Sequence, residues 1–324
     1  MQRRVCVAPM MDCTDRHCRY FHRLLAPGAG LYTEMITARA IVHGDVHRLL
    51  AFDQAEHPVA LQLGGSEPEI LRQAAARVRA GHPYDELNLN VGCPSDRVQS
   101  GRFGACLMAD PALVAECVQA MSDEWHGEVT VKSRIGIDDC DDYDFLARFV
   151  STVADAGCRV FIIHARKAIL SGLSPKENRS IPPLRYERVR RLKQDFPQLE
   201  IVLNGGIESV DMALAELGYV DGVMLGRKAY SDPCLLGVLQ AWCLDKKAPE
   251  APDRAAVVRQ MAAYARVQME KGARLHHVTR HMHGLYAGQP GAGRWRRYLA
   301  EATARRDADA DTLLRWLEVF DAAA

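Results

Sequence analysis

The sequence predicts an α/β protein, a (β/α)8 TIM barrel followed by a C-terminal all-α helical bundle. Eight short apolar runs alternate with segments of helical periodicity over the first 244 residues, and the remaining residues have helical patterns alone. Alternating strands and helices form a parallel sheet, and eight such units favour closure into a barrel. An open doubly wound sheet is the alternative, but no G-x-G-x-x-G motif follows an early strand.

The predicted strands are short apolar runs bounded by turn-forming residues. They cover residues 5–8, 31–33, 59–63, 86–89, 129–132, 159–163, 201–203 and 221–225. Helix signals lie between them. Asp110-Pro111 is a typical helix start, and apolar residues recur at helical spacing from Asp142 to Ala156.

The pattern changes beyond Trp242. Residues 245–252 are charged and contain proline, which predicts a linker between a domain at 1–244 and a second at 250–324. The second part predicts helices at 252–271, 274–287, 294–305 and 309–322. Helices of this length joined by glycine- and aspartate-containing turns form a small bundle.

Composition excludes several classes of protein. Lys+Arg 41 balance Asp+Glu 41, so a uniformly basic nucleic-acid binder is excluded, although a local basic patch is not. The 10 cysteines include no C-x-x-C pair, and His277 and His281 have no cysteine pair or carboxylate triad beside them, so we expect no metal site. No apolar run is long enough for a membrane span, and no apolar leader opens the chain, so we expect a cytoplasmic protein.

Polar, ionisable or glycine residues collect where the predicted strands end. They are Pro9, Met10 and Met11, Gln62, Asn90 and Cys93, Lys132, His164, Asn204, Gly205 and Gly206, and Gly226 and Arg227. Barrel enzymes keep their active sites on the face where the carboxyl ends of the strands meet. A set of this size and mixture indicates a catalytic barrel rather than solvated strand ends.

The glycines after the last two strands indicate a phosphate site. Barrels often bind phosphate there, because glycine lets backbone N–H groups approach the anion, and Arg227 adds a charged fork. Ordinary glycine turns are the alternative. Lys132 and His164 would lie across the mouth, where they suit a ring that becomes negative on reduction, as a flavin does. Gln62 could pair with a donor and an acceptor on the ring edge.

Cys93 lies on a loop just past a predicted strand, between Gly92 and Pro94. A thiol held there can act as an acid, a base or a nucleophile. The local pattern alone favours a small apolar side chain that fills a turn. The polar residues at the other strand ends are what give Cys93 a chemical role.

Two segments could contact a polyanion. Residues 172–179 form a long polar loop that carries Lys176 and Arg179, and residues 294–297 place Arg294, Arg296 and Arg297 around a tryptophan. An aromatic among arginines can stack on bases and bind phosphates, although Trp295 fits a core position better. A further basic helix follows the loop and predicts a solvated face; its basic residues are Arg185, Arg188, Arg190, Arg191 and Lys193.

In these residues the sequence resembles the flavin-dependent tRNA-dihydrouridine synthases over almost its whole length, and most of all their A subfamily. The most specific motif is Leu89-Asn90-Val91-Gly92-Cys93-Pro94, joined by Lys132, His164-Ala165-Arg166, Asn204-Gly205-Gly206 and Gly226-Arg227. The subfamily rests on residues 32–35, 174–179 and 280–282. Gly293 departs from the subfamily, which has a basic residue there, so the arginine that contacts tRNA is left open.

The resemblance implies reduction of the uracil C5=C6 bond in D-loop uridines at tRNA positions 20 and 20a. It implies tight, non-covalent FMN at the strand-end residues from Pro9 to Arg227, NADPH as the electron donor, and Cys93 as the acid that protonates C5. It also implies tRNA contacts by Asn90, Lys176, Arg179, Arg294, Arg296 and Arg297. We expect a monomer. Two alternatives stay open: an FMN enzyme like dihydroorotate dehydrogenase, and a tRNA-binding chaperone without catalysis.

Overall fold

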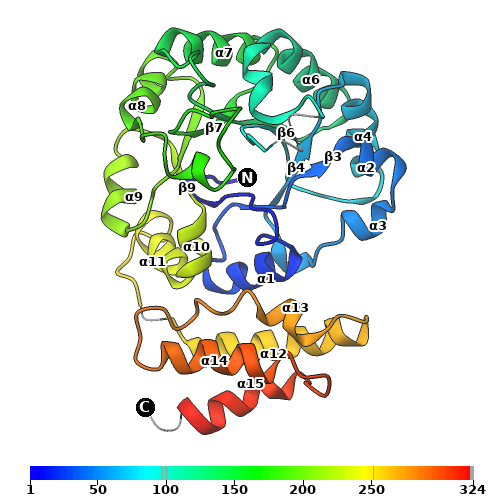
Figure 1. Cartoon of the computed structure of the whole chain (residues 1–324), viewed down its shortest axis with the longest axis vertical. Coiled ribbons are helices and arrows are strands. Elements are labelled where there is room, and N and C mark those ends of the chain that lie inside the picture. The colour runs from blue at the N-terminus through cyan, green and yellow to red at the C-terminus, as the bar shows by residue number, and fades with distance from the viewer. Residues whose placement is uncertain (96–97, 99–100, 251, 322–324) are drawn as a thin grey trace.

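The structure, a computed structural model, describes residues 1–95, 98, 101–250 and 252–321. Its centre is a parallel barrel (Figure 1). The strands are β1 (Val5–Val7), β2 (Leu31–Tyr32), β4 (Val59–Gly64), β5 (Glu86–Val91), β6 (Glu128–Arg134), β7 (Val160–His164), β8 (Glu200–Asn204) and β9 (Gly222–Leu225). They pair in the order β1-β9-β8-β7-β6-β5-β4-β2, so all eight predicted strands and the barrel class are confirmed.

The barrel closes between β1 and β2. The backbones of Cys6 and Gly30 form a parallel β-bridge. In it Gly30 O accepts from Val7 N, and Gly30 N donates to Val5 O, both at 2.9 Å. A further strand, β3 (Ile36–Thr37), pairs with the end of β4 and has no counterpart among the predicted strands. It is too short to have a recognisable alternating pattern.

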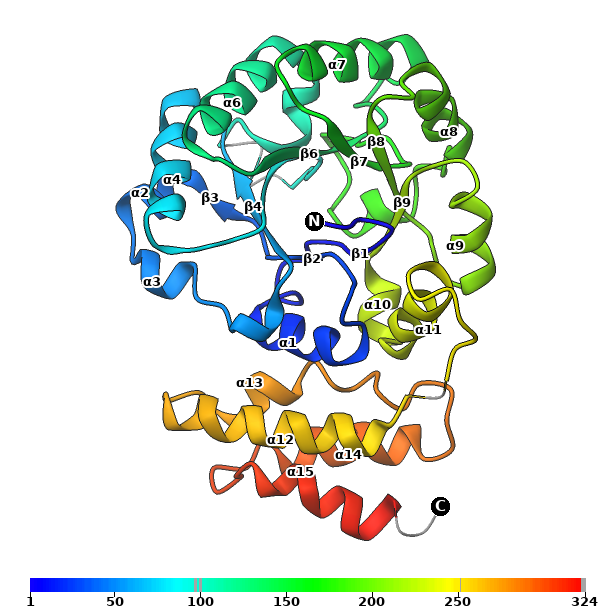
Figure 2. The same cartoon turned by 180° about the vertical axis from the view of Figure 1, so that it is seen from behind.

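Helices surround the barrel (Figures 1 and 2). They are α1 (Arg16–Leu25), α2 (Ala38–His43), α3 (Val46–Leu49), α4 (Pro68–Gly81), α6 (Pro111–Glu124), α7 (Tyr143–Asp155), α8 (Tyr186–Asp195), α9 (Val210–Glu216), α10 (Arg227–Ser231) and α11 (Cys234–Cys243), with short turns η1 (Gln54–Glu56), η2 (Gly104–Ala109) and η3 (Glu177–Arg179). The two predicted helix starts are confirmed. The Asp110 and Asp142 carboxylates accept from the backbone N–H groups of Leu113 and Phe145.

The barrel interior has an apolar and a polar side. The apolar side is a cluster of buried residues, Cys6, Ala8, Tyr32, Ala60, Val160, Ile162, Val202 and Met224. The polar side follows β5, where Glu86, Asn88 and Asn90 alternate and are all buried. Below it, at the amino-terminal ends of the strands, the Arg3 guanidinium lies 2.7 Å from Glu86 and 2.9 Å from Glu200.

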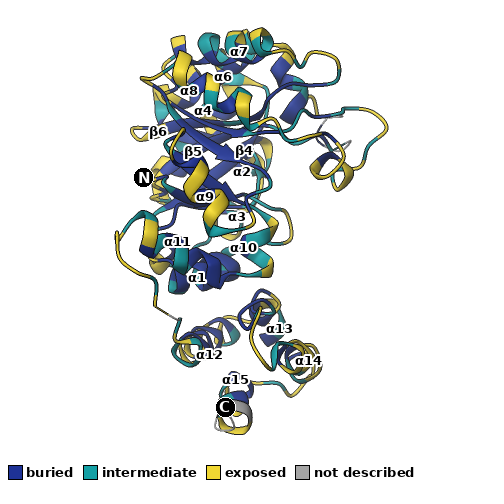
Figure 3. Ribbon diagram, turned by 90° about the vertical axis from the view of Figure 1, so that its left-hand side faces the viewer, coloured by how far each residue is buried: buried dark blue, intermediate teal, exposed yellow. Residues whose placement is uncertain are grey.

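The C-terminal residues form a separate helical layer that lies along α1 (Figures 1 and 3). Its elements are α12 (Arg254–Glu270), α13 (Leu275–Thr279), α14 (Ala292–Ala302), α15 (Asp311–Trp316) and a π-helical turn, η4 (Leu317–Asp321). Ring stacking, a hydrogen bond and an ion pair are among the contacts that fasten it to the barrel. Tyr264 stacks on Tyr20 with 3.9 Å between ring centroids and lies 2.8 Å from His17 Nδ1, and Arg280 pairs with Asp15 at 2.7 Å.

The predicted helix at 274–287 is wrong over most of its length. Only α13 is helical, and the chain continues in turns to Gly288. Two carbonyl groups of this stretch accept from side chains of other elements: Leu285 O from Arg254 Nε at 2.9 Å, and Met282 O from Trp295 Nε1 at 2.8 Å. Tertiary contacts therefore override a helical pattern that the sequence shows.

Trp295 is fully buried in this layer, as its core interpretation predicts. Its ring lies 5.1 Å from those of Tyr286 and Trp316. None of the helices within the described ranges is both long and apolar enough to cross a membrane.

Replacing Trp295 with alanine should therefore lower the free energy of unfolding by about 3–5 kcal/mol, because the change leaves a cavity and removes the hydrogen bond from Trp295 Nε1 to Met282 O. The matched control is the exposed neighbour Arg296, whose replacement with alanine should change the free energy by less than about 0.5 kcal/mol. Urea denaturation followed by circular dichroism measures both. Equal, small effects of the two changes would mean that the aromatic cluster does not hold this layer together.

Candidate active site

Three strands end side by side in register at the mouth of the barrel. Arg134 on β6 pairs with His164 on β7, which pairs with Asn204 on β8. Parallel strands place their carboxyl ends at one edge, so these polar side chains form one arc.

Lys132 lies within this arc, two residues before Arg134. Its Nζ donates to Asn204 Oδ1 at 3.1 Å, and Asn204 is fixed in turn because its Nδ2 donates to Met224 O at 2.8 Å. Burial and the nearby Arg134 guanidinium lower the pKa of Lys132 to about 7. A lysine with this lowered pKa is partly deprotonated near pH 7, and an anion bound beside it would favour its protonated form.

Lys132 belongs to a larger set of basic side chains, here called the basic cluster: Lys132, Arg134, His164, Arg166, Arg179 and Arg227. Burial and the surrounding cations hold the pKa of His164 well below its usual range, and burial lowers the pKa of Arg134 to about 10. Within the part of the chain that the structure describes, no carboxylate forms a salt bridge with any of the six. Such uncompensated positive charge predicts an anionic ligand.

The glycines at the mouth have backbone conformations that a side chain would disrupt. Gly205 has φ +111, and a Cβ there would lie 2.4 Å from the His164 ring; Gly206 has φ +70, and a Cβ there would lie 2.5 Å from Leu184. The Tyr186 hydroxyl donates to Gly205 O at 2.7 Å and fixes the turn. Arg227 begins α10 and donates to Arg179 O at 3.2 Å, which brings the loop after β7 to the same place.

Cys93 lies beside the basic cluster on the loop after β5. Asn90 Oδ1 accepts from the backbone N–H groups of Gly92 at 3.1 Å and Cys93 at 3.0 Å. Arg134 Nε donates to Gly92 O at 3.0 Å. The half-buried Cys93 thiol therefore projects from a backbone that is held on both sides, and its Sγ lies 3.6 Å from Ser95 Oγ. Residues 96, 97, 99 and 100 of this loop lie outside the described ranges.

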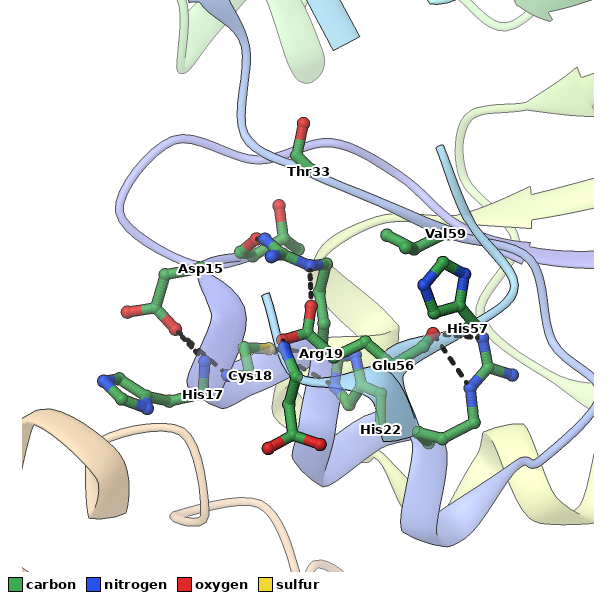
Figure 4. Close-up of polar contacts among 12 residues, drawn as sticks. Asp15, His17, Cys18, Arg19, His22, Thr33, Glu56, His57 and Val59 are labelled. Carbon is green, nitrogen blue, oxygen red and sulfur yellow. Dashed lines mark hydrogen bonds and ion pairs between the residues drawn. The ribbon is translucent and has the colours of Figure 1, made fainter. Parts of the chain in front are cut away.

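A pocket of about 820 Å³ opens beside Cys93 and is bounded by the loops that follow β1 and β2. Its lining includes Met11, Asp15, Arg19, Glu34, Cys93 and Phe103. The wall formed by α1 is held from behind, because Arg19 Nε donates to the buried Glu56 carboxylate at 2.6 Å (Figure 4). The pocket therefore gives a rigid space next to the thiol.

The structure brings some of the residues singled out from the sequence together and leaves others apart. Cys93, Lys132, His164, Asn204, the glycines 205 and 206 and Arg227 all lie at the mouth, and Met10 faces Gly226, where a Cβ would be 3.8 Å from its sulfur. Met11 is exposed at the pocket. Lys176 and Arg179 are exposed on the loop after β7, whereas Arg294, Arg296 and Arg297 are exposed on α14, in the helical layer.

Two of these residues have partners that the sequence did not suggest. Gln62 is buried, donates to Asn88 Oδ1 and accepts from Asn90 Nδ2, both at 2.8 Å. Asn90 also holds the Cys93 loop, so its oxygen is already engaged. The side-chain amides of Gln62 and Asn90 therefore already have hydrogen-bond partners within the protein.

Sequence reasoning missed two residues that shape the site. Arg134 is buried and donates to Lys167 O and Asn178 O as well as Gly92 O, so it joins two active-site loops. Asn178 is fully buried and anchors the long loop through the Ile169 backbone. The strand period of two puts Arg134 on the same face as Lys132, and that signal was available.

Comparisons with known proteins agree with this geometry. Residues 6–323 match the family model described as dihydrouridine synthase (Dus). Relatives described as tRNA-dihydrouridine(20/20a) synthase include those of Xanthomonas axonopodis pv. citri, 55% identical over 98% of this chain and 94% of the relative, and Escherichia coli K12, 56% identical over 96% and 89%. The protein of Vibrio parahaemolyticus is 56% identical over 92% and 91%.

A solved structure of 2-naphthoyl-CoA reductase with 2-naphthoyl-CoA has a similar fold. It has a TM-score of 0.54 and 10% identity, and the match covers 75% of this chain and 50% of that one. This likeness supports the barrel and nothing about the substrate. The family match and the near full-length relatives are decisive: the chain belongs to the dihydrouridine synthase family, whose members are flavin-dependent oxidoreductases.

Proposed function

We propose that this protein reduces the C5=C6 bond of D-loop uridines in tRNA, at positions 20 and 20a, with tightly bound FMN and with NADPH as electron donor. The relatives' shared description supports the reaction and the positions. The single observation that carries the cofactor proposal is the basic cluster beside Cys93. It is positive, partly buried and without carboxylate partners among the described residues, as a site for an anionic flavin needs to be.

The residues at the mouth fit FMN. The positive φ values of Gly205 and Gly206 and the guanidinium of Arg227 would hold the phosphate, and Lys132 and His164 would face the ring. Further contacts are proposed for Pro9, Met10, Met11, Gln62, Asn204 and Gly226. When bound, the flavin supplies hydride to the uracil ring.

The protein's own part of the reaction is to hold one proton at Cys93 Sγ and deliver it to C5. The Asn90 and Arg134 contacts fix the backbone on both sides of the thiol, so the proton donor has a set position relative to the pocket. The pKa of Lys132 is about 7 in the free protein, so this side chain can take up a proton and balance negative charge that appears at the mouth. The target base has to leave its stack to reach Cys93.

We further propose that residues 1–244 form the FMN-binding catalytic domain and residues 250–324 the tRNA-binding domain. Lys176 and Arg179 would contact the nucleotide near the mouth, and Arg294, Arg296 and Arg297 would contact the tRNA body; Asn90 would touch the extruded nucleotide. All five basic residues are exposed, and the chain's net charge of +0 means that binding depends on such local groups. The protein would act as a monomer in the cytoplasm.

Replacing Cys93 with alanine should leave FMN content and NADPH oxidation unchanged but lower dihydrouridine formation by about 10²–10⁴, because only protonation of C5 needs the thiol. Dihydrouridine in the tRNA is measured by mass spectrometry. Cys106→Ala, a half-buried cysteine nearby in the chain, is the matched control and should behave as the parent. Near-normal product formation by Cys93→Ala would falsify the acid role.

The affinity of the flavin-free protein for FMN should fall as the pH rises from 7 to 9. Above about pH 7 the free protein has lost the Lys132 proton, and the negative phosphate of FMN at the same mouth favours its return. If binding takes up one proton, the dissociation constant for FMN rises by as much as about tenfold for each pH unit. Lys132→Met should bind FMN more weakly at pH 7 and lose this dependence. Lys193→Met, at a surface lysine paired with Asp221, should keep it. Quenching of flavin fluorescence measures the constants, and an unaltered pH dependence in Lys132→Met would contradict the proposal.

Removing charge from either proposed tRNA contact should raise the Michaelis constant for tRNA and flatten its salt dependence. Each lost phosphate contact lowers the slope of log affinity against log salt by roughly 0.7–0.9. The variants are Lys176→Ala/Arg179→Ala and Arg296→Ala/Arg297→Ala.

Arg185→Ala/Arg191→Ala removes the same charge from two exposed arginines, one just before α8 and one within it, and serves as control. Filter-binding titrations at several salt concentrations give the slopes. Parental slopes in both test variants, or an equal loss in the control, would place the RNA on another face.

A further inference from the structure

The polar side of the barrel interior is one connected set of hydrogen bonds. From the active-site loop downward, Cys93 N donates to Asn90 Oδ1, Asn90 Nδ2 to Gln62 Oε1, Gln62 Nε2 to Asn88 Oδ1, Asn88 Nδ2 to Thr130 Oγ1, and the Thr130 hydroxyl to Glu86 Oε1. The first four distances are 3.0, 2.8, 2.8 and 2.8 Å. The set therefore runs from the loop of Cys93 to the opposite end of the barrel.

Every bond in this set points the same way. A side-chain amide has a donor end and an acceptor end, so turning one amide around forces its neighbours to turn as well. The direction is fixed at the upper end because the backbone N–H groups of Gly92 and Cys93 can only donate. It is fixed at the lower end because an ionised Glu86 can only accept.

Glu86 is built to accept. Its carboxylate is fully buried and receives the Arg3 guanidinium from Nε at 2.8 Å, the Tyr32 hydroxyl at 3.0 Å and the Thr130 hydroxyl. Arg3 is 2% exposed and approaches only the Oε2 side, whereas Thr130 and Tyr32 approach Oε1. The two oxygens therefore have different partners, one cationic and one a pair of hydroxyls.

We propose that Glu86 is a positioning residue for Cys93, because its carboxylate sets the direction of the hydrogen-bond chain that presents Asn90 Oδ1 to the Cys93 loop. The inference rests on the proposed acid role of Cys93. It assigns a function to a charge buried at the far end of the barrel, where no substrate atom reaches. Loss of that charge would leave Asn90 free to turn its amino group toward the two backbone N–H groups, which would push the loop away.

The decisive variant is Glu86→Gln, which keeps the shape and removes the charge. Arg3 still requires an oxygen on its side, so the new amino group has to face Thr130. The Thr130 hydroxyl then accepts from this amino group, and its own hydrogen turns toward Asn88. The amides of Asn88, Gln62 and Asn90 turn around in response, so each hydrogen bond of the chain reverses its direction. Thr130→Val cuts the same chain without reversing it, and Thr130→Ser keeps the hydroxyl and should restore the parental behaviour.

Hydrogen exchange of the Gly92 and Cys93 amides, read by mass spectrometry on the full-length protein, reports directly on the upper end of the chain. Glu86→Gln and Thr130→Val should each speed this exchange by about tenfold or more. Turnover of tRNA should fall by roughly 10- to 100-fold, because the proton donor loses its set position. Glu56→Gln is the matched control. It removes an equally buried carboxylate that pairs with Arg19 and does not belong to the hydrogen-bond chain from Cys93 to Glu86.

The inference is overturned if exchange at Gly92 and Cys93 is parental in both variants, if Glu56→Gln accelerates it equally, or if Thr130→Ser fails to restore it. The acid role of Cys93 is tested separately by Cys93→Ala. Parental product formation by Cys93→Ala together with faster exchange in Glu86→Gln would overturn the proposed function and leave the hydrogen-bond chain standing.

Discussion

Basic side chains at the carboxyl ends of β6 and β7, without salt-bridge partners among the described residues, are the constraint on which this site depends. Lys132, Arg134 and His164 lie close together there, and the pKa of each is held below its ordinary range by burial and by the other cations. Such an arrangement costs stability in the absence of a ligand. The closed barrel makes it possible, because the strands fix these side chains and do not let them move apart.

The same barrel supplies the other half of the site through its polar interior. In many TIM barrels the interior is filled by apolar layers. Here β5 contributes Glu86, Asn88 and Asn90 on one face, and their bonds end at the backbone of the Cys93 loop. Positive charge on one side and a directed set of amides on the other leave the thiol between them, on a loop whose backbone is fixed. The rigid outer helices, such as α1 with its Arg19–Glu56 pair, keep the adjoining pocket open.

Much of this organisation could be predicted from the sequence, for definite physical reasons. Short apolar runs predicted all eight barrel strands, because a parallel strand that is buried on both faces is apolar along most of its length. The strand-end residues Lys132, His164 and Asn204 gather as expected, since register and parallel direction follow from the fold. Gly205 and Gly206 have the positive φ values that a tight turn requires.

What could not be predicted depends on contacts between distant segments. Residues 280–287 have a helical pattern, but they are not helical. Their Leu285 and Met282 carbonyl groups accept hydrogen bonds from the Arg254 and Trp295 side chains. Gln62 was assigned from its chemistry alone, and nothing in its neighbours along the chain indicates that Asn88 and Asn90 occupy both ends of its amide. The role of Arg134 could not be predicted, because its three carbonyl partners lie on two loops that come together only when the barrel closes.

In the proposed function, Arg227 and the glycine turns after β8 and β9 bind the phosphate of FMN. Thermal unfolding of the flavin-free protein with FMN or with riboflavin, at equal concentration, tests it most directly, because the two ligands differ only in the phosphate. FMN should raise the melting temperature through its selective binding to the folded protein, and riboflavin should raise it far less. Replacing Arg227 with methionine should remove most of the difference. Equal stabilisation of the parent by riboflavin and FMN would contradict the claim.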